Sequence, residues 1–465
     1  MNHRRDVVVT VVGVAMLIVG AGPAGAGGEG GPQWAPPAID ADPAELVDMG
    51  QIRAGDAKRG TTAVFGVDES PEVRVAVRSA DPLARDGGVE VVVEWTVHDH
   101  PHSRKPVFTT KTKATVPAGE EVMVKQALPL EAPGPYWVRA ALIAGEKTIK
   151  KDLLGILYDP GGFKPELTRP DDFSEFWSRK LEAMRKVPFD AELEENESYG
   201  TKHYRGYDLE VRNHDGKRLR CVLMVPRSEG PHDAEIGAGA PGEAAKVKSS
   251  IAKAEGQPAG VGMWERGARR IRIGAASPRS ATYTRWAGRD DNNMLHCYLQ
   301  TIRLADYLRS REDVGHIWLF GASRSGPAML AAASLAPERV AAVNVHVPTS
   351  CGVSWKDRPY RGWGRPPART DEGLKTAAYF DPVNFAPDLR VPVVMDGGFY
   401  DGLSPIPGML AFCNHATNAP FVRWSIEQGR HGHFNNGGRG DMEAALAEHL
   451  AERGIKPGSP DDAAE

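Results

Sequence analysis

The sequence predicts an α/β protein in which a doubly wound, mostly parallel sheet follows a small all-β module. Three observations lead to this prediction. From Thr61 to about Asp159 the apolar residues recur with a period of two, which is typical of strands. From about Tyr204 onward, short apolar segments alternate with helical ones, which is typical of a parallel sheet with helices on both faces. The length of 465 residues leaves room for both parts.

The composition is that of an ordinary globular protein and excludes several classes of function. Hydrophobic residues make up 41% of the chain, charged residues 25%, and the formal net charge is -4. A nucleic-acid-binding protein usually has a basic surface, so we expect no nucleic-acid partner. The four cysteines lack C-x-x-C spacing, which argues against a zinc ribbon or a dithiol redox site and leaves their pairing open. They are Cys221, Cys297, Cys351 and Cys413.

Residues 1–26 have the order of a secretory signal peptide. Arg4 and Arg5 precede an apolar run from Val7 to Ala21, and small residues follow to Ala26. The run is short for a bilayer span. We therefore expect cleavage near Ala26, a secreted or periplasmic protein, and no attachment to the membrane after cleavage.

The next two segments are expected to be a flexible lead-in over residues 27–60 and an Ig-like β-sandwich over residues 61–159. The lead-in is rich in Pro, Gly and Ala. The sandwich is predicted from short alternating strands separated by turns. Such a module either packs against its neighbour, which is the more frequent case, or binds carbohydrate. The predicted strands include Val73–Val77, Val89–Val97, Val107–Val116 and Tyr136–Ile143.

Residues 160–455 are expected to form the α/β domain, and residues 456–465 a disordered tail. Pro170 is expected to open a helix, because its missing N–H is no loss in a first turn. Aromatic residues recur there at helical spacing, which favours packing over ligand binding. The predicted strands are Leu209–Arg212, Leu219–Val225, Ile317–Phe320, Val340–Val347, Val391–Met395 and Val422–Ile426. The predicted helices are Met294–Arg309, Pro327–Leu335, Ile406–His415 and Asp441–Arg453.

A strand, a sharp turn and a helix are predicted to meet at Ser323. The apolar segment Ile317–Phe320 runs into Gly321-Ala322-Ser323-Arg324-Ser325-Gly326, and a helical run follows. A nucleophile elbow needs this context, because its serine sits on a strained turn with small flanking residues. We therefore predict that Ser323 is a nucleophile, with Ser325 in a place where glycine is usual.

A serine hydroxyl needs a base to take its proton and an acid to hold that base. Two acids follow the predicted strand Val391–Met395, with Asp396 at the strand end and Asp401 in the loop beyond. The acid of such a triad usually lies in the loop. We favour Asp401 and expect Asp396 to be a turn or solvated residue.

Two histidines, His431 and His433, follow the last predicted strand, from where a histidine can reach the serine. We favour His433, which follows Gly432, as the base. A His-x-His pair could instead bind a metal, but a third ligand is not evident, so no metal site is expected.

Two backbone N–H groups are expected to bind the oxyanion of the reaction. One belongs to Arg324, the residue after the nucleophile. The other is assigned to Ala238, in the glycine-rich turn Ile236-Gly237-Ala238-Gly239. This turn is not a phosphate loop, because no Gly-Lys-Ser/Thr follows it, and no cofactor is expected.

Taken together, these features resemble the acetyl xylan esterase and cephalosporin C deacetylase family of α/β-hydrolases, from about Thr168 to Phe434. The resemblance implies an α/β-hydrolase fold and metal-free removal of O-acetyl groups from acetylated sugars. It implies Ser323 as nucleophile, His433 as general base and Asp401 as orienting acid. Beside the elbow it rests on Arg169-Pro170-Asp171-Asp172-Phe173, Phe176-Trp177, Gly288-Arg289-Asp290-Asp291, Tyr379-Phe380-Asp381, Asn384-Phe385-Ala386, Asp401 with Pro405, and Gly432-His433.

Two departures from the family pattern keep other functions open. Ile236-Gly237-Ala238 stands where the family has His-Gly-Tyr or His-Gly-Ala, and Ser323-Arg324-Ser325-Gly326 stands for Ser-Gln-Gly-Gly. Because glucuronoyl esterases also place an arginine after the nucleophile, a glucuronoyl-type or other carboxylic-ester hydrolase is one alternative. A non-catalytic carbohydrate-binding protein with the hydrolase fold is another. The oligomeric state is not predicted.

Seven arginines crowd the segment between residues 266 and 289. A charge run of this kind is usually a solvated face, and the alternative is a rim suited to uronate-bearing hemicellulose fragments. The arginines are Arg266, Arg269, Arg270, Arg272, Arg279, Arg285 and Arg289.

Overall fold

The computed structural model divides the chain into two compact units, one up to Pro160 and one from Gly161. Among the residues it describes, no helix is both long and apolar enough to cross a membrane. The predicted signal peptide and the C-terminal tail lie outside the described residues. Those residues are 47–51, 53–54, 62–79, 88–100, 103, 105–238, 270–275, 288–356, 370–431 and 437–455.

The first unit contains two β-sheets that share one hydrophobic core. One sheet has the order β1-β4-β2, with β7 also pairing with β4, and the other has the order β3-β9-β8-β5-β6. Trp95 is fully buried between them, in a cluster made of residues from both sheets. The strands are β1 (Val47–Met49), β2 (Arg53–Ala54), β3 (Ala63–Phe65), β4 (Glu72–Ser79), β5 (Val89–His98), β6 (Phe108–Val116), β7 (Glu121–Ala127), β8 (Gly134–Ala144) and β9 (Lys147–Tyr158).

This unit begins earlier than the predicted residue 61. Strands β1 and β2 lie within the segment expected to be a flexible lead-in, and both pair with β4. Met49 is fully buried. The prediction was wrong at residues 47–54, because strands of two or three residues are too short to show an alternating pattern.

The second unit is built on a nine-stranded sheet with the order β10-β11-β12-β14-β13-β15-β16-β17-β18. The pairs from β14 through β18 are all parallel, which confirms the predicted mostly parallel sheet. The strands are β10 (Glu192–Glu195), β11 (Tyr204–Arg212), β12 (Arg218–Pro226), β13 (His232–Ala238), β14 (Ile271–Ala275), β15 (Val314–Ala322), β16 (Ala342–His346), β17 (Val393–Gly398) and β18 (Val422–Glu427).

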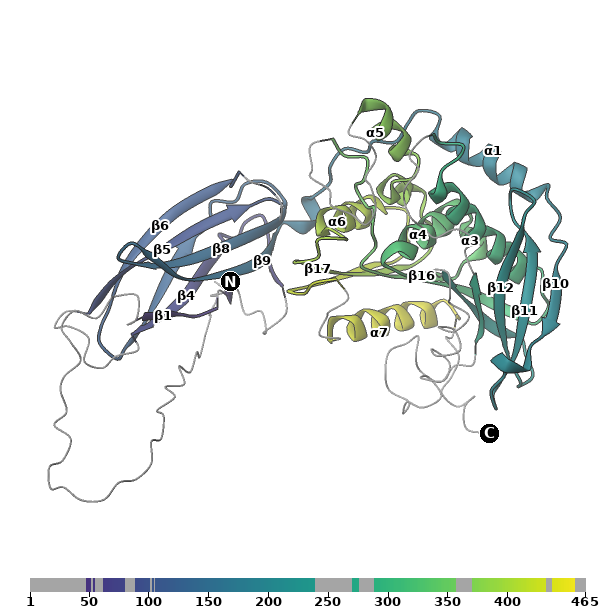
Figure 1. Ribbon diagram of the computed structural model, residues 1–465, viewed down its shortest axis with the longest axis horizontal. Helices are drawn as coiled ribbons and strands as arrows, with labels where there is room; N and C mark the ends of the chain where they lie inside the picture. The colour runs from purple at the N-terminus through teal and green to yellow at the C-terminus, as the bar shows by residue number, and fades with distance from the viewer. Residues whose placement is uncertain are drawn as a thin grey trace, which may run out of the picture. The chain divides into compact units, whose positions relative to one another are not determined.

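Helices cover both faces of this sheet (Figure 1). On one face α7 buries Leu446 and Leu450 against Trp318 of β15. Figure 1 shows α3, α4 and α6 on the opposite face. The helices are α1 (Phe173–Arg185), α3 (Asn293–Arg309), α4 (Gly326–Leu335), α5 (Asp371–Ala378), α6 (Ile406–His415) and α7 (Gly437–Glu452).

Helix α1 is held by its aromatic stripe, as predicted. Phe173, Phe176 and Trp177 are each 1% exposed. The Trp177 ring N–H donates to the carbonyl of Tyr379 at 3.1 Å, and the Phe176 and Tyr379 rings lie 4.9 Å apart. The stripe therefore joins α1 to the Tyr379-Phe380-Asp381 segment.

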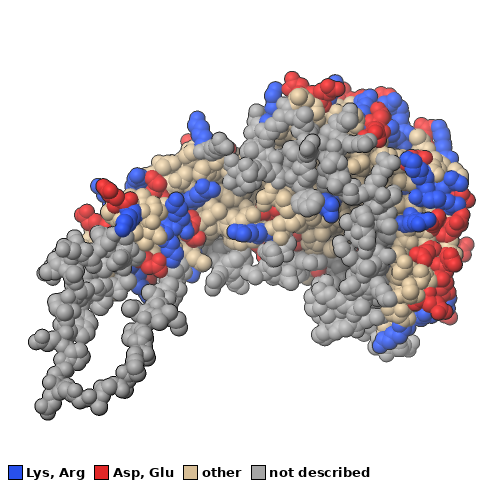
Figure 2. All heavy atoms as spheres, viewed as in Figure 1, with Lys and Arg blue, Asp and Glu red and all other residues tan. Residues whose placement is uncertain are grey.

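Strand β14 was not predicted, because it lies inside the arginine-rich segment. It pairs with β12 on one side and β13 on the other. Arg270, immediately before it, is only 2% exposed and packs over the Trp318 ring at 5.0 Å. The expectation of a solvated face was therefore wrong at Arg270. Over the described surface in Figure 2, basic and acidic side chains are interspersed.

Two histidines meet where the β11–β12 turn packs on the first turn of α3. Nε2 of His214 lies 2.7 Å from Nδ1 of His296. Burial lowers the pKa of His214 to about 4, with help from the charge of His296. Lys180 and Lys217 act in the same direction, and Asp215 opposes them. The folded protein therefore holds His214 neutral above about pH 4.

The free energy of unfolding should fall as the pH is lowered from about 6.5 toward 4. Histidine in an unfolded chain has a pKa of about 6.5, whereas His214 takes up a proton only near pH 4. Between these values the unfolded state binds more protons, so this contribution to stability is full above the window and is lost as the pH falls. His214→Asn should reduce the difference between the thermal unfolding midpoints measured at pH 7.5 and at pH 4.5. An unchanged difference would contradict the assignment.

Candidate active site

Ser323 occupies a strained turn between β15 and α4. Its φ is +53°, a region that non-glycine residues rarely adopt. The small neighbours are required by space. A Cβ on Gly321 would lie 2.7 Å from Cγ of Met329, and a Cβ on Gly326 would lie 2.7 Å from Cγ1 of Val345. The turn thus has the context of a nucleophile elbow.

Ser325, the residue that departs from the usual pattern, stabilises this turn. Its hydroxyl accepts from the Ala322 N–H at 2.8 Å and donates to the Ala322 carbonyl at 2.9 Å. A glycine at this position could make neither bond. The hydroxyl closes the turn around Ser323, so the departure has a structural reason.

Ser325→Gly should lower kcat/KM for an acetyl ester about 5- to 150-fold, because it removes two hydrogen bonds that contribute roughly 0.5–1.5 kcal/mol each. Labelling of Ser323 by a phosphonate should persist at a reduced rate. A variant as active as the wild type would show that the two bonds do not hold the turn. Ser174→Gly, on the exposed face of α1, is a control for the substitution itself.

Asp401 and His431 complete a hydrogen-bonded chain to this serine. Nε2 of His431 lies 2.9 Å from Oγ of Ser323, and Nδ1 of His431 lies 2.7 Å from Oδ2 of Asp401. The other carboxylate oxygen of Asp401 accepts from the N–H groups of Leu403 and Ser404 at 2.8 and 3.0 Å. With Asp401 fixed, Nδ1 carries the proton and Nε2 is free to accept the serine proton.

The three side chains come from loops at one edge of the sheet. Ser323 follows β15, Asp401 follows β17 and His431 follows β18, and β15 through β18 are parallel neighbours. Their carboxyl ends therefore lie at the same edge, which is where open α/β sheets bind ligands. The Asp401 side chain is fully buried, whereas that of His431 is 28% exposed, as a base that must meet a substrate requires.

The choice of His433 over His431 must be corrected. His433 lies outside the described residues, and His431 makes both contacts that the base should make. The cause is a tertiary contact, because the Tyr400 N–H donates to the carbonyl of Gly429 at 2.8 Å. Gly429 lies two residues before His431, and Tyr400 is next to Asp401. This bond therefore holds the loop after β18 beside Asp401. The two histidines are separated by a single residue, and the sequence alone does not show which of them this hydrogen bond brings to Ser323.

Asp396, the acid that was not favoured, belongs to a second pair. It lies on β17 with its carboxylate 2.5 Å from Nδ1 of His346, on the neighbouring strand β16. Asp396 is 6% exposed and His346 is 8% exposed. The expectation of a turn or solvated residue was therefore wrong. Asp396 lies two residues after Val394, which packs against α7, so its side chain lies on the face of the sheet that α7 covers.

The two expected oxyanion donors come from two neighbouring strands of the sheet, whose printed register ends at Gly237 opposite Phe320. Arg324 follows Ser323 directly, and Ala238 is the last residue of β13, which pairs in parallel with β15. The predicted glycine-rich turn is strand through Ala238, because Ile236, Gly237 and Ala238 belong to β13. Gly239, which completes the predicted turn, lies outside the described residues.

The described cysteines form no disulfide, and the described potential metal ligands form no cluster. All four cysteines are free thiols, and Cys221, Cys351 and Cys413 are buried. Among the residues that the structure describes, no three His, Cys, Asp or Glu side chains are placed to hold a metal ion.

Comparisons with known proteins point to one enzyme family. The model of the acetyl xylan esterase family matches residues 157–431. An acetyl esterase of Xylanibacter ruminicola is 26% identical over 270 residues, which are 52% of this chain and 61% of that protein. The chain thus matches less than two thirds of that relative's length.

Two solved structures are similar to the chain. An acetyl xylan esterase from a Thermoanaerobacterium species is 21% identical, with a TM-score of 0.49 and coverage of 62% of this chain and 95% of that one. An acetyl xylan esterase from a Paenibacillus species is 19% identical, with a TM-score of 0.49 and coverage of 64% and 97%. The family model matches more than half of the length of this chain. The chain therefore belongs to the acetyl xylan esterase family.

Proposed function

We propose that this protein is an exported serine esterase that removes O-acetyl groups from acetylated xylan or related sugars. Membership of the acetyl xylan esterase family supports a carboxylic-ester hydrolase. The observation that carries the mechanism is the continuous chain from Asp401 through His431 to Ser323. Export rests on the signal-like order of residues 1–26.

In the first half-reaction His431 takes the proton of Ser323 while Oγ attacks the acetyl carbonyl carbon. The backbone N–H groups of Arg324 and Ala238 bind the oxyanion of the tetrahedral intermediate. His431, now protonated and held by Asp401, gives its proton to the sugar oxygen, and the deacetylated sugar leaves. An acetyl group remains on Ser323.

In the second half-reaction water takes the place of the sugar hydroxyl. His431 removes a proton from the water, which attacks the acetyl carbonyl, and the same two N–H groups bind the oxyanion. The proton returns to Ser323 as acetate is released. The balance is one ester and one water consumed for one alcohol and one carboxylic acid formed.

The alternative of a non-catalytic, carbohydrate-binding protein was motivated by the altered elbow. The bonds made by Ser325 support an intact turn instead. The proposal therefore keeps turnover at Ser323.

Reaction with a serine-directed phosphonate, followed by mass spectrometry of the peptides, tests the nucleophile. We expect one adduct, at Ser323, and none in Ser323→Ala. Release of acetate from acetylated xylan, compared with release of methanol from a methyl glucuronate ester, tests the ester. A label elsewhere would overturn the triad, and faster methanol release would favour the glucuronoyl-type reaction.

A further inference from the structure

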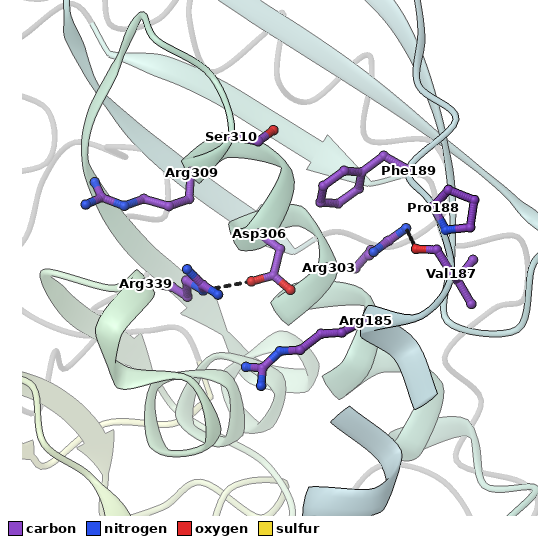
Figure 3. Close-up of a pocket in the computed structure, with 9 residues that line it drawn as sticks. All are labelled: Arg185, Val187, Pro188, Phe189, Arg303, Asp306, Arg309, Ser310 and Arg339. Atoms are coloured by element: carbon purple, nitrogen blue, oxygen red, sulfur yellow. Dashed lines mark hydrogen bonds and ion pairs between the residues drawn. The ribbon is translucent and has the colours of Figure 1, made fainter. Parts of the chain in front are cut away.

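A cavity on the second unit gathers four arginines far from Ser323. Its volume is about 390 Å³, at the small end of ligand pockets. Figure 3 shows it between the ends of α1 and α3, with Arg185, Arg303, Arg309 and Arg339 around Asp306. Val187, Pro188 and Phe189 form an apolar wall, and Ser310 completes the lining.

Arg303 is the most deeply buried of the four arginines. It is 2% exposed, and its guanidinium donates to the carbonyls of Val187 and Arg212 at 2.6 and 2.9 Å. It also stacks over the Phe189 ring at 4.0 Å. In the part of the chain that the structure describes, no carboxylate lies within ion-pair distance of it. A buried cation bound only to neutral carbonyls is costly unless an anion joins it.

The other charges of the cavity are only partly compensated. Arg339 pairs with Asp306 at 2.8 Å, and Arg185 reaches Glu338 only at 3.6 Å. Arg309 makes no ion pair with a described residue. Burial raises the pKa of Asp306, and the charges of Arg339, Arg185 and Arg303 oppose this rise, so these guanidinium groups converge on one carboxyl.

The charge balance favours a ligand with a single negative charge. Four guanidinium groups face Asp306, Glu338 and the C-terminal ends of α1 and α3, and each helix end carries about half a negative charge. The four positive charges exceed these negative charges by about one. Arginine pairs a planar carboxylate through two parallel bonds, and the apolar wall suits the C–H face of a sugar ring.

We propose that this cavity binds a sugar carboxylate, such as a uronic acid unit, at a site separate from the catalytic one. The cavity lies before the amino ends of β15 and β16, whereas Ser323 follows the carboxyl end of β15. Nine residues of strand separate the two ends by roughly 30 Å. The site would hold a charged branch of a polymer whose acetyl groups are removed elsewhere. The choice of a sugar rests on the proposed function, whereas the affinity for a carboxylate does not.

Calorimetric titration of the full-length Ser323→Ala protein tests this site without any ester. Methyl glucuronoside should bind saturably, whereas methyl glucoside, which lacks only the carboxylate, should bind at least 10-fold more weakly. Arg185→Gln and Arg309→Gln, which change exposed residues, should each weaken glucuronoside binding several-fold. Arg179→Gln, which pairs with Glu175 elsewhere on α1, is the matched control and should have no effect.

Each other outcome overturns part or all of the proposal. Equal binding of the two sugars would remove the role of the carboxylate. Inorganic phosphate or acetate binding as tightly as the glucuronoside would indicate an ion site that does not recognise sugar. Absence of binding, with Ser323 still labelled in the wild type, would reject this cavity while leaving the esterase intact.

Discussion

His431→Ala should lower kcat for an acetyl ester by about 10⁴- to 10⁶-fold, while His433→Ala should leave it within about 3-fold of the wild type. The large loss is expected because Nε2 of His431 is the group that faces Oγ of Ser323, at 2.9 Å. Without it the serine has no base, and the protonation of the leaving sugar oxygen is lost as well. Hydrolysis of 4-nitrophenyl acetate by both variants is the measurement.

The double variant Ser323→Ala with His431→Ala sharpens this test. Members of a catalytic triad act as a unit, so removing both should cost little more than removing one. Losses that multiply would show that the two residues act independently. The reverse pattern, with His433→Ala inactive and His431→Ala active, would restore the original choice of base.

Ser323 and Asp401 could be predicted because the residues around each of them in the sequence indicate its role. An apolar strand, small residues and a helix surround Ser323, and Asp401 follows an apolar strand by a short loop. Both signals are local in sequence, since each depends only on one strand and the residues that directly follow it. The structure places both residues in the hydrogen-bonded chain with His431.

The remaining errors arise where a residue's role is set by contacts distant in sequence. The choice between His431 and His433 depends on the bond between Tyr400 and Gly429. Asp396 has the sequence surroundings of a turn, and only the neighbouring strand shows that His346 is its partner. Strand β14 is short and flanked by arginines, so its burial between β12 and β13 depends on the assembled sheet.

Asp381→Ala should lower the stability of the second unit by about 3–5 kcal/mol, which corresponds to a fall in the unfolding temperature of roughly 6–15 °C. Asp381 is fully buried. One of its oxygens accepts from the N–H groups of Gly352 and Val383 at 2.9 and 3.0 Å. The other accepts from the N–H and the hydroxyl of Ser354 at 3.0 and 2.6 Å.

The physical reason is that alanine would leave three backbone N–H groups without an acceptor in a site that water does not reach. Each such group costs about 1–3 kcal/mol. Burial alone raises the pKa of Asp381, and the bonds from Ser354, Gly352 and Val383 oppose that rise, which is why the carboxyl is tolerated there at all. The loss should therefore exceed that of an ordinary surface substitution by a wide margin.

Asp388→Ala is the matched control, because its carboxylate is 39% exposed and pairs with Arg169 at 2.8 Å. An exposed ion pair contributes about 0–1 kcal/mol, so this variant should unfold within about 2 °C of the wild type. Calorimetry of both variants separates the two carboxylates, and the transition to follow is that of the second unit. Equal midpoints for Asp381→Ala and Asp388→Ala would mean that the bonds around Asp381 form without stabilising the fold. A large loss confined to Asp381→Ala would show that this buried carboxylate joins the segment after β16 to the Tyr379-Phe380-Asp381 segment packed against α1.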